Sequence, residues 1–431
     1  MVGSMLAIYM RKRGYQVSIF ERRPDLRKTD ISAGKSINLA LSNRGLRPLA
    51  ELGLEKDIQK MIIPMKGRMM HDEDGHLNFQ PYGKEGQVIN SISRGGLNSL
   101  LLTNAEMLGV DTHFEHSCVE ADLSNNVLKF NSDGAIKTES ADLIFGADGA
   151  FSVIRKAMDQ SPDFKSSEDF VAHGYKELSF PPNSEGGFAL DQHALHIWPR
   201  GNFMLIALPN LDGSFTVTLF LPFEGDRSFE QLEDAAEVEQ FFKSNFADAL
   251  ELMPNLLEEF DENPVGSMVT VRTYPWVSQT TTLIGDAAHA IVPFYGQGMN
   301  CGFEDCYVLN KLLDDLEEDW PAVLDQFQQL RKQDADAIAD LALQNFIEMR
   351  DKVGDALFLT RKKIEAKLHR LYPDKWIPQY TMVTFSPDIR YSEALNQGNV
   401  QQSIMDKVML QKNIVERWDD IDLAPIIEAL P

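Results

Sequence analysis

The residues best suited to chemistry stand together in one stretch, TTLIGDAAHAIVPFYGQGMNCGFEDC, residues 281–306. A short apolar run predicts a strand that stops at Gly285-Asp286, and helical composition begins at Met299-Asn300. The loop between them contains Pro293, Gly296 and Gly298. Glycine lets a loop backbone approach a ligand closely, and a helix N-terminus offers unpaired N–H groups with a partial positive charge. The stretch therefore predicts an anion-accepting corner suited to a ribityl chain and a flavin ring.

Asp286 stands where this strand ends, and its carboxylate allows two interpretations. It can accept hydrogen bonds from the hydroxyl groups of a ligand, or it can cap a helix through residues 287–291. A second turn of the same kind ends in Asp148-Gly149, after a predicted strand at Asp142–Phe145 and before a predicted helix at Phe151–Met158. A lone Asp-Gly is usually only a tight turn. Two such turns together predict one extended ligand held between them.

The first residues resemble the second half of a dinucleotide-binding unit. We predict a helix over residues 1–13 that ends at Gly14, and a strand over Tyr15–Phe20 that delivers Glu21-Arg22-Arg23. In such units an acid about 20 residues past a glycine turn bonds the adenosine ribose, and the spacing from Gly3 to Glu21 fits. The strand and first glycines that should precede the helix are missing, so we expect the natural chain to begin further upstream. The alternative is an ordinary surface helix, which makes Glu21 a plain charge at a strand end.

A possible carboxylate site lies in the alternating, strand-like segment Met61–Tyr82, which contains Arg68 and Tyr82. Guanidinium is a fixed bidentate donor, so an Arg and a Tyr in one pocket could bind a carboxylate. On composition alone a single Arg is more often a surface charge. The next segment, Ser91–Leu108, predicts a helix that is entered at Ser93-Arg94 and ended by Gly109.

From His173 to Phe223 long alternating strands predict an antiparallel sheet. Its apolar residues, Ile206, Leu208 and Phe220 among them, could line a pocket or simply form core. His193 and His196 would point to opposite faces of one strand, so we predict no metal site there. After residue 310 the chain reads as mostly helical, and Asn345 and Glu348 share a face of a helix over Ala335–Lys352, where plain solvent exposure is the alternative.

Composition narrows the class of protein. The chain has 431 residues and a formal charge of −24, which argues against nucleic acid and against an anionic membrane surface as partners. Its length allows two or three domains. Three cysteines form no disulfide framework, there is no apolar run of about 18 residues, and no signal peptide is visible. We therefore expect a cytoplasmic protein without a membrane anchor.

Longer segments carry a family likeness: KSINLALSNRG (35–45), KGRMMH (66–71), LHIWPRGNFMLIALPNLDGSFTVTLFLPFEG (195–225), VPFYGQGMNCGFEDC (292–306) and IPQYTMVTF (377–385). The two acidic glycine turns resemble those of class A flavin aromatic hydroxylases with the p-hydroxybenzoate hydroxylase fold, and the longer segments resemble the kynurenine 3-monooxygenase family. The resemblance implies an α/β fold in three parts. These are a Rossmann-like FAD-binding domain (1–60, 84–165 and 265–310), an antiparallel-sheet substrate domain (61–83 and 166–264) and a helical C-terminal region (311–431).

The resemblance also implies a reaction, the hydroxylation of L-kynurenine at ring position 3 with FAD, NADPH and O₂, through a flavin hydroperoxide. The cofactor does the difficult chemistry, so no side chain is expected to act as a general acid or base. The residues expected around the substrate are Arg68, Tyr82, Leu195, Ile206, Leu208, Phe220, Phe294, Asn345, Glu348 and Tyr380. Those expected to contact FAD are Gly3, Glu21, Arg22, Arg94, Asp148, Gly149, Gly285, Asp286, Pro293, Gly296, Gly298, Met299 and Asn300.

The sequence departs from the family pattern at both ends. The N-terminal glycine turn is absent, and residues 426–431 do not continue into the hydrophobic anchoring tail of animal and fungal members. Two alternatives follow: a related flavin hydroxylase that acts on another aromatic acid, and a flavin-binding protein without turnover. Nothing in the sequence indicates an oligomeric state.

Overall fold

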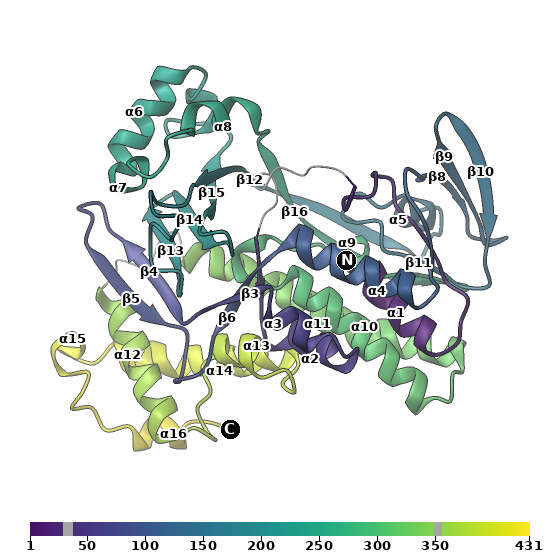
Figure 1. Cartoon of the computed structure of the whole chain (residues 1–431). Coiled ribbons are helices and arrows are strands. Elements are labelled where there is room, and N and C mark those ends of the chain that lie inside the picture. Colours follow the sequence, from purple (N-terminus) through teal and green to yellow (C-terminus); the bar gives the residue numbers. More distant parts are fainter. Residues whose placement is uncertain (29–37, 349–355) are drawn as a thin grey trace.

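The computed structural model describes residues 1–28, 38–348 and 356–431 (Figure 1). Its N-terminal helix α1 (Val2–Lys12) buries Met5, Leu6, Ile8 and Tyr9 and packs against α4 (Arg94–Met107) and α10 (Gly298–Asp315). Gly14 follows α1 with φ of +94°, a left-handed conformation that ends a helix without strain only in glycine. The predicted helix and its stop are confirmed.

Short parallel strands lie beside this helix. β1 (Ser18–Phe20) pairs with β7 (Asp111–His113), and β11 (Ile144–Gly146) pairs with β18 (Thr281–Leu283), which is also antiparallel to β17 (Val277–Ser278). A second layer contains β2 (Asn38–Leu41), β6 (Ile89–Ser93) and β3 (Ile62–Met65), and a meander of β8 (Ser117–Asp122), β9 (Val127–Ser132) and β10 (Ala135–Ser140) projects at one side (Figure 1). Three short helices, α2 (Asn43–Glu51), α3 (Glu55–Gln59) and α5 (Val153–Met158), connect these strands.

A seven-stranded sheet forms the other half of the molecule. Its order is β16 (Gly266–Tyr274), β12 (Lys165–Phe180), β15 (Phe215–Pro222), β14 (Phe203–Pro209), β13 (Ala194–Arg200), β4 (Gly67–His71) and β5 (Leu77–Pro81). Trp198, Leu205 and Val217 face α6 (Ala235–Asn245), α7 (Ala247–Leu250) and α8 (Leu256–Glu262), which follow the 3-10 turn η2 (Phe229–Gln231). Ile197, Met204 and Phe220 face the opposite way, toward α11 (Trp320–Ile347). This second face is the one available to a site.

Helices complete the C-terminal part. α10 and α11 run through the middle of the molecule, and α12 (Ala356–Leu371), α13 (Gln379–Phe385), α14 (Tyr391–Met409), α15 (Ile414–Arg417) and α16 (Ala424–Glu428) lie below the sheet (Figure 1). Asp319 caps α11 through the backbone N–H of Ala322, and Pro321 occupies the first turn, where its missing donor costs nothing. Within the described residues, no helix is long and apolar enough to cross a membrane.

Four expectations about elements are corrected. Residues 91–93 belong to strand β6 and not to the following helix, because they pair with β2 and β3. The first strand covers only Ser18–Phe20, since only these residues pair with β7. The large sheet is mixed, because β4 joins β13 in parallel. The helix that carries Asn345 begins at Trp320, well before Ala335, and Glu348 is its C-cap; residues 349–352 of the expected helix lie outside the described residues, as do Lys35–Ile37.

Candidate active site

The two acidic glycine turns lie at the same end of a pair of parallel strands. β11 and β18 are in register with Gly146 opposite Leu283, so their following turns emerge side by side. Gly285 has φ of +60° and Gly149 has φ of +84°, conformations that side chains other than glycine rarely adopt. A Cβ atom on Gly285 would also lie 3.1 Å from the side chain of Val2 on α1. The sequence therefore places both turns where backbone and helix α1 approach each other closely.

The carboxylates at these turns differ in what they contact. Asp286 is exposed and is the first residue of α9 (Asp286–His289), whose N-cap is Gly285. The capping interpretation of Asp286 is corrected, because Gly285 is the N-cap of α9 and Asp286 is already the first residue of that helix. Asp148 instead accepts hydrogen bonds from the backbone N–H groups of Val153 (2.8 Å) and Ile154 (3.3 Å), and so holds the start of α5.

The loop after α9 is held firmly at both ends. It contains the 3-10 turn η3 (Pro293–Tyr295), and Gly296 follows with φ of +67°. A Cβ atom on Gly296 would lie only 2.9 Å from Cβ of Ala40. Asn300 Nδ2 donates to the carbonyls of Gly296 (2.7 Å) and Ala40 (2.8 Å). Gln297 Oε1 accepts from the Tyr391 hydroxyl at 2.9 Å. Gly298 and Met299 open α10, whose N-cap Gln297 makes no side-chain cap hydrogen bond, so the first backbone N–H groups of this long helix have no side-chain acceptor among the residues that the structure describes.

Of the other residues expected at the same site, Gly3 lies beside the Asp148 turn. Gly3 sits in the first turn of α1, where a Cβ atom would lie 3.2 Å from Cβ of Ala147, so its absence allows the close approach of helix and turn. Glu21 follows β1 and accepts hydrogen bonds from the backbone and side chain of Arg23, both at 3.0 Å. Burial raises the pKa of Glu21, but the Arg23 bonds outweigh it and the net pKa is lowered. Arg22 and Arg94 are exposed.

These features fit an extended dinucleotide such as FAD. Three positive-φ glycines let the backbone come close, an exposed carboxylate at Asp286 has no cap to make, and α10 begins with unpaired donors. A ligand with hydroxyl groups and anionic groups would satisfy all of them. The fit concerns the shape and donor set of the site, and the role of each residue stays a proposal.

Three tyrosines and an arginine form a second cluster beside this loop. The Tyr380 ring stacks between Tyr82, at 5.8 Å, and Tyr295, at 5.3 Å, between ring centroids. The guanidinium carbon of Arg68 lies 4.9 Å from the Tyr380 centroid and 5.7 Å from that of Tyr82. Arg68 Nε is buried without a hydrogen-bond partner, and no carboxylate of the described residues forms an ion pair with this side chain. The side chain as a whole is half-buried, but a buried donor left unpaired is costly, so a carboxylate ligand would stabilise it.

An apolar wall adjoins the tyrosines and connects them to the glycine loop. Leu208 packs in one cluster with Tyr82, and Leu195 and Ile206 contact both that cluster and the one that contains Phe220 and Phe294. The rings of Phe220 and Phe294 are 5.0 Å apart.

Polar residues of α11 close this side of the site. Asn345 Nδ2 donates to the Phe294 carbonyl at 2.6 Å. Glu348 is the C-cap of the same helix, and its backbone N–H donates to the carbonyl of Asn345, so it lies one turn further along α11. Glu348 also lies 3.9 Å from Lys362 Nζ. All ten residues expected around the substrate therefore lie in one region.

Comparisons with known proteins decide the family. A family model described as an FAD binding domain matches residues 1–342. The chain is 47% identical to a kynurenine 3-monooxygenase of Cytophaga hutchinsonii over 98% of this chain and 95% of that protein. It is 42% identical to that of Anopheles gambiae over 96% of this chain and 86% of that protein. The chain belongs to the kynurenine 3-monooxygenase family.

Solved structures agree on the fold. 2-Methyl-3-hydroxypyridine-5-carboxylic acid oxygenase superposes with a TM-score of 0.67 at 20% identity, over 90% of this chain and 95% of that one. The monooxygenase PqsL of Pseudomonas aeruginosa superposes with a TM-score of 0.63 at 18% identity, over 81% of this chain and 96% of that one. The predicted α/β fold of the flavin hydroxylases and the family resemblance are confirmed.

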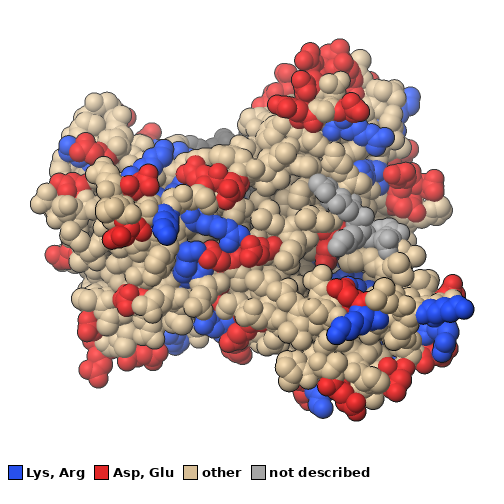
Figure 2. All heavy atoms as spheres, turned by 180° about the vertical axis from the view of Figure 1, so that it is seen from behind, with Lys and Arg blue, Asp and Glu red and all other residues tan. Residues whose placement is uncertain are grey.

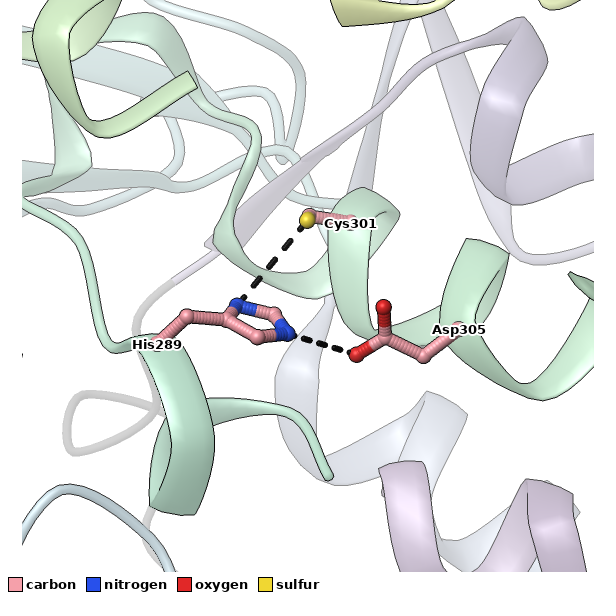
Figure 3. A group of neighbouring side chains, drawn as sticks. All are labelled: His289, Cys301 and Asp305. Carbon is pink, nitrogen blue, oxygen red and sulfur yellow. Dashed lines mark hydrogen bonds and ion pairs between the residues drawn. The ribbon is translucent and has the colours of Figure 1, made fainter. Parts of the chain in front are cut away.

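Sequence reasoning missed two parts of this family member's site. Tyr295 stacks on Tyr380 from within the glycine loop, and its only signal was an aromatic residue between Phe294 and Gly296. His289, Cys301 and Asp305 form a buried group with ligand atoms within 4.8 Å of one another (Figure 3). His289 Nε2 lies 2.6 Å from Asp305 Oδ2, and Nδ1 lies 3.9 Å from Cys301 Sγ.

This buried group is an ion-pair network and not a metal centre. Arg331 donates to Asp305 Oδ1 at 2.7 Å and to Cys301 Sγ at 3.3 Å, so a guanidinium already occupies the acceptors that a cation would need. Burial by itself lowers the pKa of His289, but the Asp305 carboxylate raises it well above its ordinary value of 6.5. Asp305 correspondingly has a lowered pKa, against the effect of burial, because His289 and Arg331 carry positive charge beside it.

Proposed function

We propose that this chain hydroxylates L-kynurenine to 3-hydroxy-L-kynurenine, with bound FAD, NADPH as reductant and O₂ as the second substrate. Its family membership supports the reaction type, since relatives 47% identical over nearly the whole chain are kynurenine 3-monooxygenases. The observation that supports the substrate assignment is Arg68, a half-buried side chain among tyrosines beside an apolar wall, whose buried Nε has no hydrogen-bond partner in the described part of the chain. An aromatic amino acid supplies both the missing carboxylate and a ring for the wall.

The proposed roles follow from position. Arg68 and Tyr82 hold the carboxylate of the substrate, and Leu195, Ile206, Leu208, Phe220 and Phe294 pack against its ring. Tyr380, Asn345 and Glu348 close the site between the substrate and the glycine loop. When bound, FAD would pass electrons from NADPH to O₂, and one atom of that O₂ would enter the product as the hydroxyl group. The residues themselves bind and orient the substrate and exclude water, so that O₂ is not reduced to H₂O₂ without hydroxylation.

FAD would be held by the turns and helix starts described above. Asp286 and Glu21 offer carboxylate acceptors for hydroxyl groups, and the backbone at Gly149, Gly285, Gly296 and Gly298 can approach the ligand closely. The remaining proposed contacts are Gly3, Arg22, Arg94, Asp148, Pro293, Met299 and Asn300.

Surface charge supports small-molecule partners only. On the face shown in Figure 2, lysine and arginine side chains are interspersed with acidic ones, and acidic side chains gather over the layer of α6, α7 and α8. A nucleic-acid partner would need a continuous basic surface. We therefore propose that no nucleic acid binds, and we keep a cytoplasmic location as a proposal from composition.

A panel of matched ligands tests this function. NADPH oxidation by the FAD-loaded protein is measured with L-kynurenine, with kynuramine, which lacks the carboxylate, and with anthranilate, which lacks the amino-acid chain. We expect strong acceleration by L-kynurenine and, for kynuramine, a KM raised about 100-fold, because its carboxylate is missing from Arg68. Equal acceleration by anthranilate would instead favour a related hydroxylase of another aromatic acid.

A further inference from the structure

Two neighbouring acids on α10, Glu304 and Asp305, share one arginine in the core. Arg331 of α11 donates to Glu304 Oε2 at 2.8 Å and to Asp305 Oδ1 at 2.7 Å. Their side chains are 5% and 0% exposed. Successive residues of a helix point about 100° apart, so the pair reaches in two directions from one fixed point.

Asp305 contacts the segment Gly285–His289, which we call the flavin turn because it presents Asp286, a proposed FAD contact. Its Oδ2 accepts a hydrogen bond from the backbone N–H of Gly285 at 3.2 Å and lies 2.6 Å from His289 Nε2 (Figure 3). Gly285 and His289 flank the short helix that starts at Asp286. One carboxylate oxygen therefore holds both ends of the element that presents Asp286.

Glu304 reaches toward the substrate side. Its Oε1 accepts from Arg44 Nη1 at 2.7 Å, and the Arg44 side chain is completely buried. Arg44 then donates to carbonyls at the end of α13 and in the loop after it, namely those of Met382 (3.3 Å), Val383 (2.7 Å), Ser386 (3.4 Å) and Ile389. Helix α13 carries Tyr380 at its other end, where that ring contacts Arg68.

We propose that Glu304 and Asp305 are positioning residues that fix the flavin turn and the Tyr380 helix relative to each other. Asp305 positions the flavin turn, and Glu304 positions the Tyr380 helix, α13, through Arg44. The inference rests on the proposed function, because the relative placement matters only when both ligands react. Misplacement of about 1 Å is enough to lower the rate of a positioned reaction severely. If the aromatic ring of the substrate is displaced, NADPH, a proton and O₂ react to give NADP⁺ and H₂O₂, and no hydroxylated product forms.

The test separates the two acids by what each variant changes. Glu304→Gln and Asp305→Asn each remove one buried charge and keep the side-chain shape. For each variant we measure the FAD dissociation constant by flavin fluorescence, the ratio of 3-hydroxykynurenine formed to NADPH oxidised, and the melting temperature. We expect Asp305→Asn to weaken FAD binding about tenfold or more, the loss of one charge-assisted hydrogen bond. Glu304→Gln should leave FAD binding within about twofold but lower the product ratio at least about twofold, with H₂O₂ making up the difference.

Two further variants keep the result decisive. Arg44→Lys retains a charge opposite Glu304, but one ammonium group cannot span the carbonyls that the guanidinium fork reaches, so it should lower the product ratio in the same way. Arg44→Lys also decides the question if Glu304→Gln does not fold. Asp248→Asn is the matched control, because Asp248 is bonded to His71 and Trp198 at the other face of the large sheet. It should lower the melting temperature and leave FAD binding and the product ratio at wild-type values.

The outcomes are distinct. Wild-type product ratios in both Glu304→Gln and Arg44→Lys, or equal losses of FAD affinity in the two acid variants, would overturn the positioning role. A wild-type protein that makes no 3-hydroxykynurenine would overturn the proposed function instead, and FAD affinity would still decide the role of Asp305.

Discussion

Arg68 is the residue on which the proposed recognition of the substrate depends most. Its Nε is buried and unpaired, and the rings of Tyr82 and Tyr380 cover the guanidinium without neutralising it. Cation–π contacts contribute about 0.5–2 kcal/mol, less than a paired carboxylate would. If Arg68 binds the substrate carboxylate as proposed, the free protein is less stable than it would be with an apolar residue there, and the substrate gains affinity.

Arg68→Met tests this exchange of stability for affinity. Because it removes a half-buried charge whose Nε has no hydrogen-bond partner and which has no carboxylate partner among the described residues, we expect the melting temperature of the substrate-free protein to stay the same or rise. The affinity for L-kynurenine should fall about 100-fold, equivalent to about 3 kcal/mol. Tyr82→Phe, which deletes one neutral hydrogen-bonding group, is the control and should cost less. Calorimetric titration that shows unchanged affinity in Arg68→Met would remove this residue from the site.

His289 predicts a pH dependence of stability. Its folded-state pKa is raised above 6.5, because it faces the Asp305 carboxylate, with Cys301 and the Trp276 ring completing its surroundings. A raised pKa contributes stability that is fully present below about pH 6.5 and is lost as pH rises through the folded-state value. The difference in unfolding free energy between wild type and His289→Asn should be largest at acidic pH. Above about pH 6.5 this difference should shrink by up to about 1.4 kcal/mol per pH unit.

Urea unfolding at several pH values measures this difference directly, and groups that titrate alike in both proteins cancel. A difference that stays constant from pH 6 to pH 9 would show that folding does not raise the pKa of His289, and a difference that grows with pH would show that folding lowers it. At the residue scale, the roles of Arg68 and Asp286 stay predictions, that of Arg68 resting on the family resemblance and that of Asp286 on the turn in which it lies. The sequence did not reveal His289 or Arg331, because their partners come from separate helices.

The glycine loop is the element on which both halves of the site depend. Gly296 has φ of +67°, and a Cβ atom there would lie 2.9 Å from Ala40. Gly201, in the turn between β13 and β14, has φ of +68° and open space around it. The two glycines therefore share a backbone conformation and differ in what surrounds them.

Gly296→Ala and Gly201→Ala form a matched pair. Each should lower stability by about 1–2 kcal/mol, because alanine is strained in the left-handed region. Only Gly296→Ala should also weaken FAD binding, since the added methyl group displaces the loop from Ala40. Thermal melts and flavin fluorescence give the two quantities. Equal FAD affinity in the two variants would contradict a ligand-contacting role for this loop.

Sequence patterns predicted helices and strands well where contacts between residues close in the sequence determine them. Helix α1 with its glycine stop and the hairpin of β14 and β15 follow from periodicity and turn residues. Residues 91–93 read as helix but form β6, because pairing with two distant strands outweighs local preference. The parallel pairing of β4 with β13 joins segments more than a hundred residues apart, and alternation cannot distinguish a parallel from an antiparallel neighbour.

At the scale of the whole molecule, the proposed substrate site is assembled from five separate segments. Arg68 comes from β4, Tyr82 from the residue after β5, Phe220 from β15, Tyr295 from η3 and Tyr380 from α13. Their meeting depends on the large sheet packing against α11, which no local pattern encodes. The predicted three-part division of the chain stays a prediction, and β16, assigned there to the FAD-binding part, is hydrogen-bonded to β12 in the large sheet.

The most direct test of the central claim follows the oxygen atom. The FAD-loaded protein is supplied with NADPH and L-kynurenine under ¹⁸O₂, and the product is analysed by mass spectrometry. We expect 3-hydroxy-L-kynurenine that carries one ¹⁸O atom, with none taken from water. Consumption of NADPH without a labelled hydroxylated product would contradict the proposed reaction, even if flavin is bound.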